Sequence, residues 1–317
     1  MPLWIPASRR SIQSEVENMA KNMKLNKAPN EVKKRGMWSE LWHNFKKSPS
    51  AMLGLVVIGI IIILAIWAQF AYDYDTDIVE QHIKERFQEP NAEHLLGTDQ
   101  YGRDMLTRIL YGAKYSLSVG IVSMAIACTV GSTLGLIAGY YGGWVENIIL
   151  RTCEVFVGIP TILLGVAIMT AFGQSLGVLM WAIGLVYVPL FARTARAAVL
   201  PVRSEEYIEA ARMAGVSDMG IIFKHILPNS LSPIIVRTTM GVASGVLSAS
   251  SLSFLGMGVP VPAPEWGAML SNGREFIRDH SYLTLFPGLA IMITVLAFNL
   301  VGDGLRDALD PKLKRKG

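Results

Sequence analysis

An uncharged and almost wholly apolar run extends from Ser50 to Tyr72, and it constrains the fold more than any other feature of the sequence. A helix needs about 20 predominantly apolar residues to cross the hydrocarbon core of a bilayer. Lipid offers backbone groups no hydrogen-bond partner, so such a run must satisfy its own backbone as a helix. We therefore expect a transmembrane helix here and a membrane protein overall.

The same reasoning extends to six expected spans. The five that follow the first are about Ser116–Ala138, Ile148–Ala171, Gly177–Ala192, Leu231–Leu255 and Thr284–Val301. The composition agrees, because only 17% of the 317 residues are charged, against about 25% in a typical soluble protein. We predict an all-α polytopic membrane protein with six transmembrane helices.

The distribution of charge predicts the topology, because basic residues are enriched on the cytoplasmic side. The N-terminal residues 1–49 are basic, and so is the C-terminal end from Lys312 to Lys316. The loop at about 73–115 carries nine acidic and five basic residues and is expected outside. The basic segment Arg193–Ser230 is then inside, and both termini are cytoplasmic.

Three regions follow from this topology. Residues 1–49 form a cytoplasmic tail, in which Met37–Phe45 has the amphipathic pattern of a helix that lies in the membrane interface. Residues 50–303 form the transmembrane domain, with a cytoplasmic loop at 203–228, and residues 304–317 form a second tail. No cleavable signal precedes the first span, which we expect to act as an uncleaved insertion signal.

Three local features within and between the spans carry open alternatives. Arg151 and Glu154 are spaced to pair on one helix face and to reach water at little cost, rather than to line a pathway. The small residues of the fifth span from Gly241 to Ser253 favour close helix packing over a translocation path. The proline-rich segment Pro260–Asn272 predicts a rigid outer loop.

The polar stretch Glu205–Pro228 lies between two apolar spans and is rich in helix formers. Ser204 is expected to cap a first short helix, and Gly215 to end it in a left-handed turn. A second short helix, Met219–His225, follows, and Pro228 is expected to break it before the fifth span. The alternative is an ordinary solvated connector.

The residues of this stretch resemble the EAA loop of binding-protein-dependent ABC importer permeases. The resemblance rests on Glu209-Ala210-Ala211, Gly215 and Ile226-Leu227-Pro228. It implies that the loop docks on an ATP-binding subunit, with His225 as a departure from the usual aliphatic residue. The docking residues that it implies are Glu205, Glu206, Glu209, Ala210, Ala211, Gly215, Leu227 and Pro228.

A second motif is similar to that of the dipeptide, oligopeptide and nickel permeases, in particular their C-type subunit. Leu96–Asp104 reads LGTDQYGRD and precedes Gly112–Leu117, in which Lys114 replaces the usual arginine. The resemblance extends from about residue 38 to 313 and implies a type I ABC importer permease fold. The outer motif residues are Gly97, Thr98, Asp99, Gly102, Arg103 and Asp104. We hold a helix cap formed by Thr98 or Asp99 and a gating role as equal alternatives.

Nothing in the sequence predicts chemistry in this chain itself. The phosphate-binding GxxxxGK[ST], metalloprotease HExxH and hydrolase GxSxG patterns are absent, and the five histidines form no ligand cluster. We therefore expect no cofactor here, with ATP and Mg²⁺ bound by partner subunits. The resemblance implies a B-type permease as heterodimer partner, two ATP-binding subunits and an extracytoplasmic substrate-binding protein, in a prokaryotic cytoplasmic membrane and without nucleic acid.

The resemblance implies a subunit that translocates peptides, and two alternatives stay open. One is import of nickel chelates by the same machinery. The other is an ion-coupled secondary transporter, a class that usually carries an ionisable residue near the centre of a span. The centres of the expected spans carry none, which argues against that second alternative.

Overall fold

The computed structural model describes residues 37–309, and they form helices, helical turns and loops without a named β-strand in that range. The chain divides into two units, residues 1–43 and residues 44–317. The expected tail segments 1–36 and 310–317 lie outside the described residues. Helix α2 (Met37–Phe45) forms where the amphipathic pattern predicts a helix, and its place at a membrane interface stays a prediction.

The first two spans begin at clear capping residues. Helix α3 (Pro49–Ala71) follows Ser48, whose hydroxyl accepts a hydrogen bond from the Ala51 amide at 3.4 Å. Helix α4 (Met105–Tyr141) contains 37 residues and extends beyond the expected second span at both ends. It starts at Met105 because the Asp104 carboxylate caps it by accepting from the Thr107 amide at 2.8 Å.

The third span is not one straight helix, as the apolar run predicts, but two helices bent by 88°. Helix α5 (Gly143–Val157) ends at Gly158, and helix α6 (Thr161–Phe172) begins directly after Pro160. Proline has no amide hydrogen to donate and disfavours helical backbone in the residue before it, so it separates the two apolar helices. The structure thus has five long apolar helices, or six spans if the bent pair is counted as one.

The remaining spans are longer than hydropathy predicts. They are α7 (Leu176–Arg203), α10 (Leu227–Phe254) and α12 (Tyr282–Leu309), each of 28 residues. The polar turns that the hydropathy pattern excludes, such as Arg193–Arg203, simply continue the helix. Apolar length marks the part of a helix that lipid covers, whereas the helix itself continues wherever its backbone stays bonded.

The expected break at Pro228 is absent. Short helix α9 (Asp218–Gly220) leads into the π-helical turn η3 (Ile221–Ile226) and then directly into α10. The Leu227 amide donates to the carbonyl of Ile222, five residues earlier. Pro228 therefore stands in the first turn of α10, where its missing amide hydrogen is tolerated.

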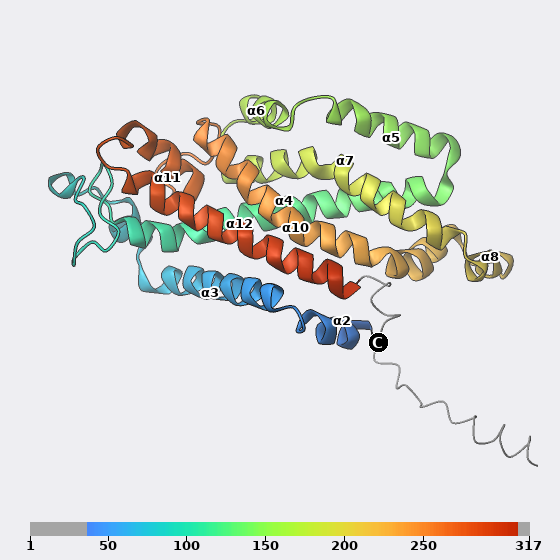
Figure 1. Cartoon of the computed structure of the whole chain (residues 1–317). Coiled ribbons are helices and arrows are strands. Elements are labelled where there is room, and N and C mark those ends of the chain that lie inside the picture. Colours follow the sequence, from blue (N-terminus) through green and yellow to red (C-terminus); the bar gives the residue numbers. More distant parts are fainter. Residues whose placement is uncertain (1–36, 310–317) are drawn as a thin grey trace, which may run out of the picture. The chain divides into compact units, whose positions relative to one another are not determined.

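The helices of residues 44–309 pack in a bundle that Figure 1 shows from the side. Helix α4 lies along α7, and α10 lies between α12 and the α4–α7 pair, while α3 covers α12. The small residues of α10 serve close packing, as expected, because a Cβ atom on Gly245 would lie 3.2 Å from the Gly120 Cα of α4. The buried residues Met124, Ala127, Phe191 and Leu252 belong to the core between these helices.

The expected loop at Pro260–Asn272 instead contains helix α11 (Trp266–Gly273). Its start is fixed by Glu265, a fully buried carboxylate that accepts from the amides of Gly267 and Ala268 at 2.9 Å. The other short elements are η1 (Tyr74–Val79), η2 (Ile83–Glu85), α8 (Glu206–Met213) and η4 (Arg274–Phe276). Turns η1 and η2 and helix α11 lie at the opposite end of the bundle from α8 (Figure 1).

Candidate functional site

The loop at 203–228 presents α8 at one end of the bundle (Figure 1). Ile208 is 1% exposed and packs with buried residues of α4, α7 and η3, including Tyr140, Val199 and Ile226. The opposite side of α8 faces outward, where Met213 is 89% exposed. One exposed apolar side chain is common on a protein surface, so its meaning depends on the residues around it.

The residues that the EAA resemblance implies fall mostly on this outward side. Ala211 and Leu227 are half-buried and pack against the Ile208 cluster. The other six are exposed: Glu205, Glu206, Glu209, Ala210, Gly215 and Pro228. Four apolar side chains of the same loop that the motif does not include are also exposed, namely Tyr207, Met213, Met219 and Phe223.

Ser204 is not the cap of α8, contrary to the sequence-based expectation. The capping position is Glu205, whose side chain makes no capping hydrogen bond. Helix α7 continues to Arg203, so Ser204 ends that helix instead and donates its hydroxyl to the Pro201 carbonyl at 2.9 Å. The length of α7 therefore decides the role of Ser204.

Gly215 ends α8 in the left-handed conformation that the sequence predicts, with φ of +78°. The Gly215 amide donates to the Arg212 carbonyl and the Val216 amide to the Ala211 carbonyl, at 3.0 and 3.1 Å. This pair of bonds is a Schellman motif, and Val216 and Ala211 both pack against the Ile208 cluster. The turn thus fixes the direction in which the chain leaves α8.

We expect Gly215→Ala to loosen this turn without a clash, because no atom lies within 4 Å of the position of the new Cβ. A left-handed conformation costs a residue with a Cβ about 1–2 kcal/mol. Hydrogen exchange of the amides at 215 and 216 should accelerate by about 5–30-fold. Gly177→Ala is the matched control, since that position has equal space and no left-handed φ, and equal exchange in the two variants would contradict this role of the turn.

Contacts of Tyr140 link the loop to the end of α4. The Tyr140 hydroxyl donates to the Asp218 carboxylate at 2.6 Å and accepts from Arg212 at 3.5 Å. The Tyr140 contact raises the pKa of Arg212, which stays charged. Close by, Arg196 of α7 and Glu146 of α5 form a partly buried ion pair. These polar contacts connect α8 and the start of α9 to the end of α4.

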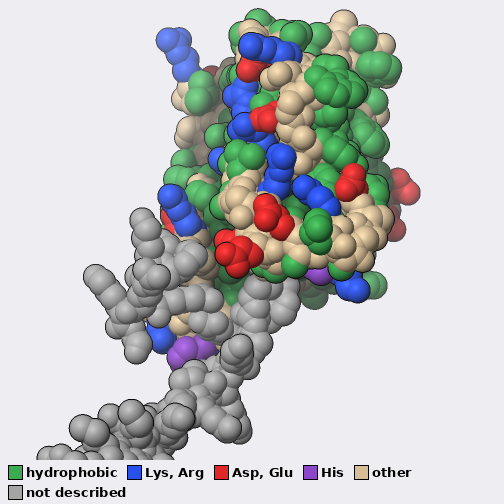
Figure 2. All heavy atoms as spheres, turned by 90° about the vertical axis from the view of Figure 1, so that its right-hand side faces the viewer, with side chains coloured by type: hydrophobic (Ala, Val, Ile, Leu, Met, Phe, Trp, Pro, Cys, Tyr) green, Lys and Arg blue, Asp and Glu red, His purple; other side chains and the backbone are tan. Residues whose placement is uncertain are grey.

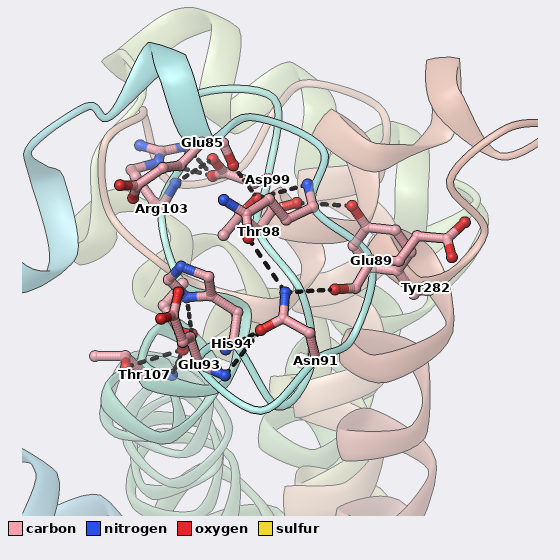
Figure 3. A network of polar contacts seen from close by, with 12 residues as sticks. Glu85, Glu89, Asn91, Glu93, His94, Thr98, Asp99, Arg103, Thr107 and Tyr282 are labelled. Atoms are coloured by element: carbon pink, nitrogen blue, oxygen red, sulfur yellow. Dashed lines mark hydrogen bonds and ion pairs between the residues drawn. The ribbon is translucent and has the colours of Figure 1, made fainter.

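The outer motif Leu96–Asp104 forms a network at the opposite end of the bundle (Figure 3). The buried Asp99 carboxylate accepts from the amides of Tyr101 and Arg103 at 2.8 and 3.0 Å. It also pairs with the Arg103 guanidinium at 2.7 Å, and the Arg108 Nε lies 3.8 Å away. One carboxylate thus holds the turn and neutralises part of the charge of two buried arginines.

The neighbouring residues of the motif fix the outer loop in place. The fully buried Thr98 hydroxyl accepts from the Gln88 amide at 2.9 Å and donates to the Glu85 carbonyl, while Tyr282 of α12 donates to the Thr98 carbonyl at 2.9 Å. Gly97 has a φ of +77° and closes the turn before Thr98. Thr98 and Asp99 were expected to cap a short helix before the second span, but residues 98–104 form no helix. The cap at this place is Asp104, which begins α4 itself. Asp104 also pairs with His94 at 2.9 Å.

Three charged residues inside the bundle carry no motif and are missed by sequence reasoning. Arg108 is 1% exposed and donates to the carbonyls of Ile78 and Pro262, which joins the two outer loops. Glu265 caps α11 and lies 3.4 Å from the Ser116 hydroxyl. Arg237 interrupts the apolar run of the fifth span, and this single interruption is the signal that could have identified it. The expected pair of Arg151 and Glu154 is confirmed, at 2.9 Å and largely exposed.

Two family models match the chain. The model described as binding-protein-dependent transport system inner membrane component matches residues 131–315. The model described as the N-terminal TM domain of oligopeptide transport permease C matches residues 36–90. Together they include α3, the loop with α8 and most of the described helices.

Curated relatives are similar over nearly the whole chain. The dipeptide transport system permease protein DppC of Alkalihalophilus pseudofirmus is 47% identical over 277 residues, which are 87% of this chain and 90% of the relative. The glutathione transport system permease protein GsiD of Pectobacterium atrosepticum is 43% identical over 281 residues, which are 88% and 93% of the two chains.

Solved structures show the same fold at low identity. An inward-facing structure of the MetNI methionine ABC transporter has a TM-score of 0.53 and 19% identity, and covers 65% of this chain and 98% of its own. The structure of an amino acid ABC transporter with histidines has a TM-score of 0.50 and 14% identity. The match covers 63% of this chain and 94% of the transporter chain. The expected ABC permease fold is therefore confirmed.

Proposed function

We infer the function of this chain from its family: it belongs to the binding-protein-dependent transport system inner membrane components, and it is a permease of an ABC importer. We propose that its cargo is short peptides. The two relatives described above carry a dipeptide and glutathione, which are both short peptides with free carboxylates. Nickel chelates and ion-coupled transport are less well supported than peptide import by ATP-driven machinery.

The exposed side of α8 is the observation that carries the proposed coupling. Glu205, Glu206, Glu209 and Met213 are all exposed, and the other side of this short helix packs on the bundle through Ile208. We propose that this side docks on an ATP-binding subunit in the cytoplasm. Closure of two such subunits on ATP would then move α8, and the contacts of Tyr140 would carry the movement to α4.

The remaining partners follow the same proposal. A B-type permease completes the translocation path as a heterodimer, and an extracytoplasmic binding protein delivers the peptide. ATP and Mg²⁺ bind the ATP-binding subunits, so this chain does no chemistry itself. The complex lies in the cytoplasmic membrane of a prokaryote, with the α8 end of the bundle inside and the Asp99 network outside.

Glu209→Lys tests the coupling. The reversed charge on the docking side should lower peptide uptake by about tenfold or more, since a charge-assisted contact is worth about 1.5–3 kcal/mol, while the amount of protein in the membrane stays unchanged. Uptake of labelled dipeptide and ATP hydrolysis are measured in vesicles that contain all subunits. Glu154→Lys is the control, because it reverses another exposed carboxylate, on α5 rather than on α8.

Normal uptake and ATP hydrolysis by the Glu209→Lys complex would show that α8 is not the docking helix. The cargo is tested separately with the unaltered complex. It should restore growth on dipeptides to a strain that lacks its own peptide importers. Failure on peptides together with rescue under nickel limitation would replace peptides by nickel chelates as the cargo.

A further inference from the structure

Two adjoining hollows lie between α7, α10 and α12 at the α8 end of the bundle. Their volumes are about 490 and 710 Å³, within the range of about 300–1,000 Å³ that small-molecule sites occupy. Five residues line both hollows: Thr194, Ser232, Pro233, Arg237 and Leu309. They therefore form one continuous cavity, large enough for a short peptide.

The charges that line this cavity are all positive. Arg193 comes from α7, Arg237 from α10 and Arg306 from the last turn of α12. No aspartate or glutamate lines it among the described residues. Figure 2 views this end of the molecule, where Lys and Arg side chains lie on the surface together with several acidic side chains.

Within residues 37–309, none of the three arginines forms an ion pair with a carboxylate. Arg237 is half-buried ten residues into an apolar helix, where an unpaired charge is costly and marks a functional site by default. A cleft lined by one sign of charge concentrates ions of the opposite sign. The planar guanidinium group binds carboxylates through two parallel hydrogen bonds.

The wall of the cavity also offers hydrogen-bond acceptors. Pro201 and Pro233 lie inside α7 and α10 and have no amide hydrogen, so the carbonyls of Ala197 and Asn229 lose their usual helical donor. Ala197 and Asn229 both line the cavity. A ligand with a carboxylate at one end and an ammonium group at the other would satisfy both kinds of group.

We propose that Arg193, Arg237 and Arg306 form a carboxylate-binding site on the cytoplasmic side of the permease, which receives the free C-terminus of the imported peptide. This proposal rests on the proposed peptide function and adds a recognition site within the permease to it. The site binds peptide in the state in which the cavity is open. Peptides with a blocked C-terminus therefore bind it weakly.

The test uses the complete complex without its binding protein, in nanodiscs of phosphatidylcholine. Equilibrium binding of labelled dialanine and of dialanine amide is measured. Dialanine should bind about tenfold more tightly than the amide, as expected for the loss of one charge-assisted interaction. Arg237→Gln should weaken dialanine binding to the level of the amide and leave amide binding unchanged.

Two further variants keep the test specific. Arg237→Lys keeps the charge but not the planar guanidinium group. Its affinity for dialanine should therefore lie between that of the Arg237→Gln variant and that of the unaltered complex. Arg151→Gln removes an exposed arginine that already has a carboxylate partner on α5, and it should bind like the unaltered complex. Equal loss in Arg151→Gln and Arg237→Gln would overturn the site.

Two other outcomes would also overturn the assignment. Equal affinities of dialanine and its amide in the unaltered complex would exclude a carboxylate site. Loss of dialanine binding in nanodiscs that contain phosphatidylglycerol would show that the arginines hold a lipid headgroup instead. These two outcomes overturn only the carboxylate site. If the unaltered complex still takes up dialanine, the proposed function in peptide import remains supported, so the experiments distinguish failure of one proposal from failure of the other.

Discussion

Asp99→Ala should lower the free energy of unfolding by about 3–5 kcal/mol, the usual loss when one member of a buried ion pair is removed. Asp99 and Arg103 are 5% and 3% exposed, and the Arg108 Nε has no hydrogen-bond partner of its own. The substitution leaves two buried guanidinium groups beside each other without a counter-charge. The loss is measured by denaturant titration in mixed micelles, followed by tryptophan fluorescence.

The matched control for this prediction is Glu154→Ala. It removes a carboxylate from an ion pair of similar length, 2.9 Å, whose side chains are 80% and 49% exposed. Exposed pairs contribute about 0–1 kcal/mol, so the control should change little. Adding Arg103→Leu to Asp99→Ala should restore part of the stability, because it removes one of the two unpaired charges. Equal effects of the two single substitutions would refute the buried-charge explanation.

Gly102→Ala should destabilise the outer loop by about 2–5 kcal/mol, through backbone strain and overpacking together. Gly102 has a φ of +79°, and a Cβ there would lie 1.9 Å from the backbone oxygen of His82. The backbone oxygen cannot rotate away as a flexible side chain could. Resistance to external protease in right-side-out vesicles measures the effect, because the loop must open locally to be cut.

Gly173→Ala separates the two causes. Gly173 has a similar φ of +85°, but no atom lies within 4 Å of a Cβ at that position. It should lose only the strain contribution of about 1–2 kcal/mol. If Gly102→Ala and Gly173→Ala lose the same amount of stability, the contact with His82 is not what requires glycine at position 102.

A helix could be predicted from the sequence where its own residues and the surrounding lipid are enough to require it. A run such as Ser50–Tyr72 has one stable form in lipid, and α3 forms at Pro49–Ala71. The polar turns at helix ends were not predictable, because hydropathy does not register a helix that continues into water. This is why α7 continues from the expected end at Ala192 to Arg203, and why Ser204 loses its expected capping role.

The candidate sites divide in the same way. The conformation of Gly215 follows from its own residue type and its position after a helix, so the sequence predicts it. The capping role of Asp104 was missed because three carboxylate or hydroxyl side chains compete within Thr98–Asp104. Only the fold shows that the Asp99 carboxylate pairs with the Arg103 guanidinium. It also shows that the Thr98 hydroxyl bonds to the backbone of Glu85 and Gln88.

The sequence by itself determined the membrane location, the helical class and the exposed loop around α8, because apolar length and charge act without knowledge of neighbours. Only the tertiary structure decided which polar residues from different helices meet. It placed Tyr140 of α4 beside Asp218 and brought Arg193, Arg237 and Arg306 to one cavity from three helices. The physical reason is that a charge in a membrane protein is defined by its partner, and partners from distant helices meet only when the bundle forms.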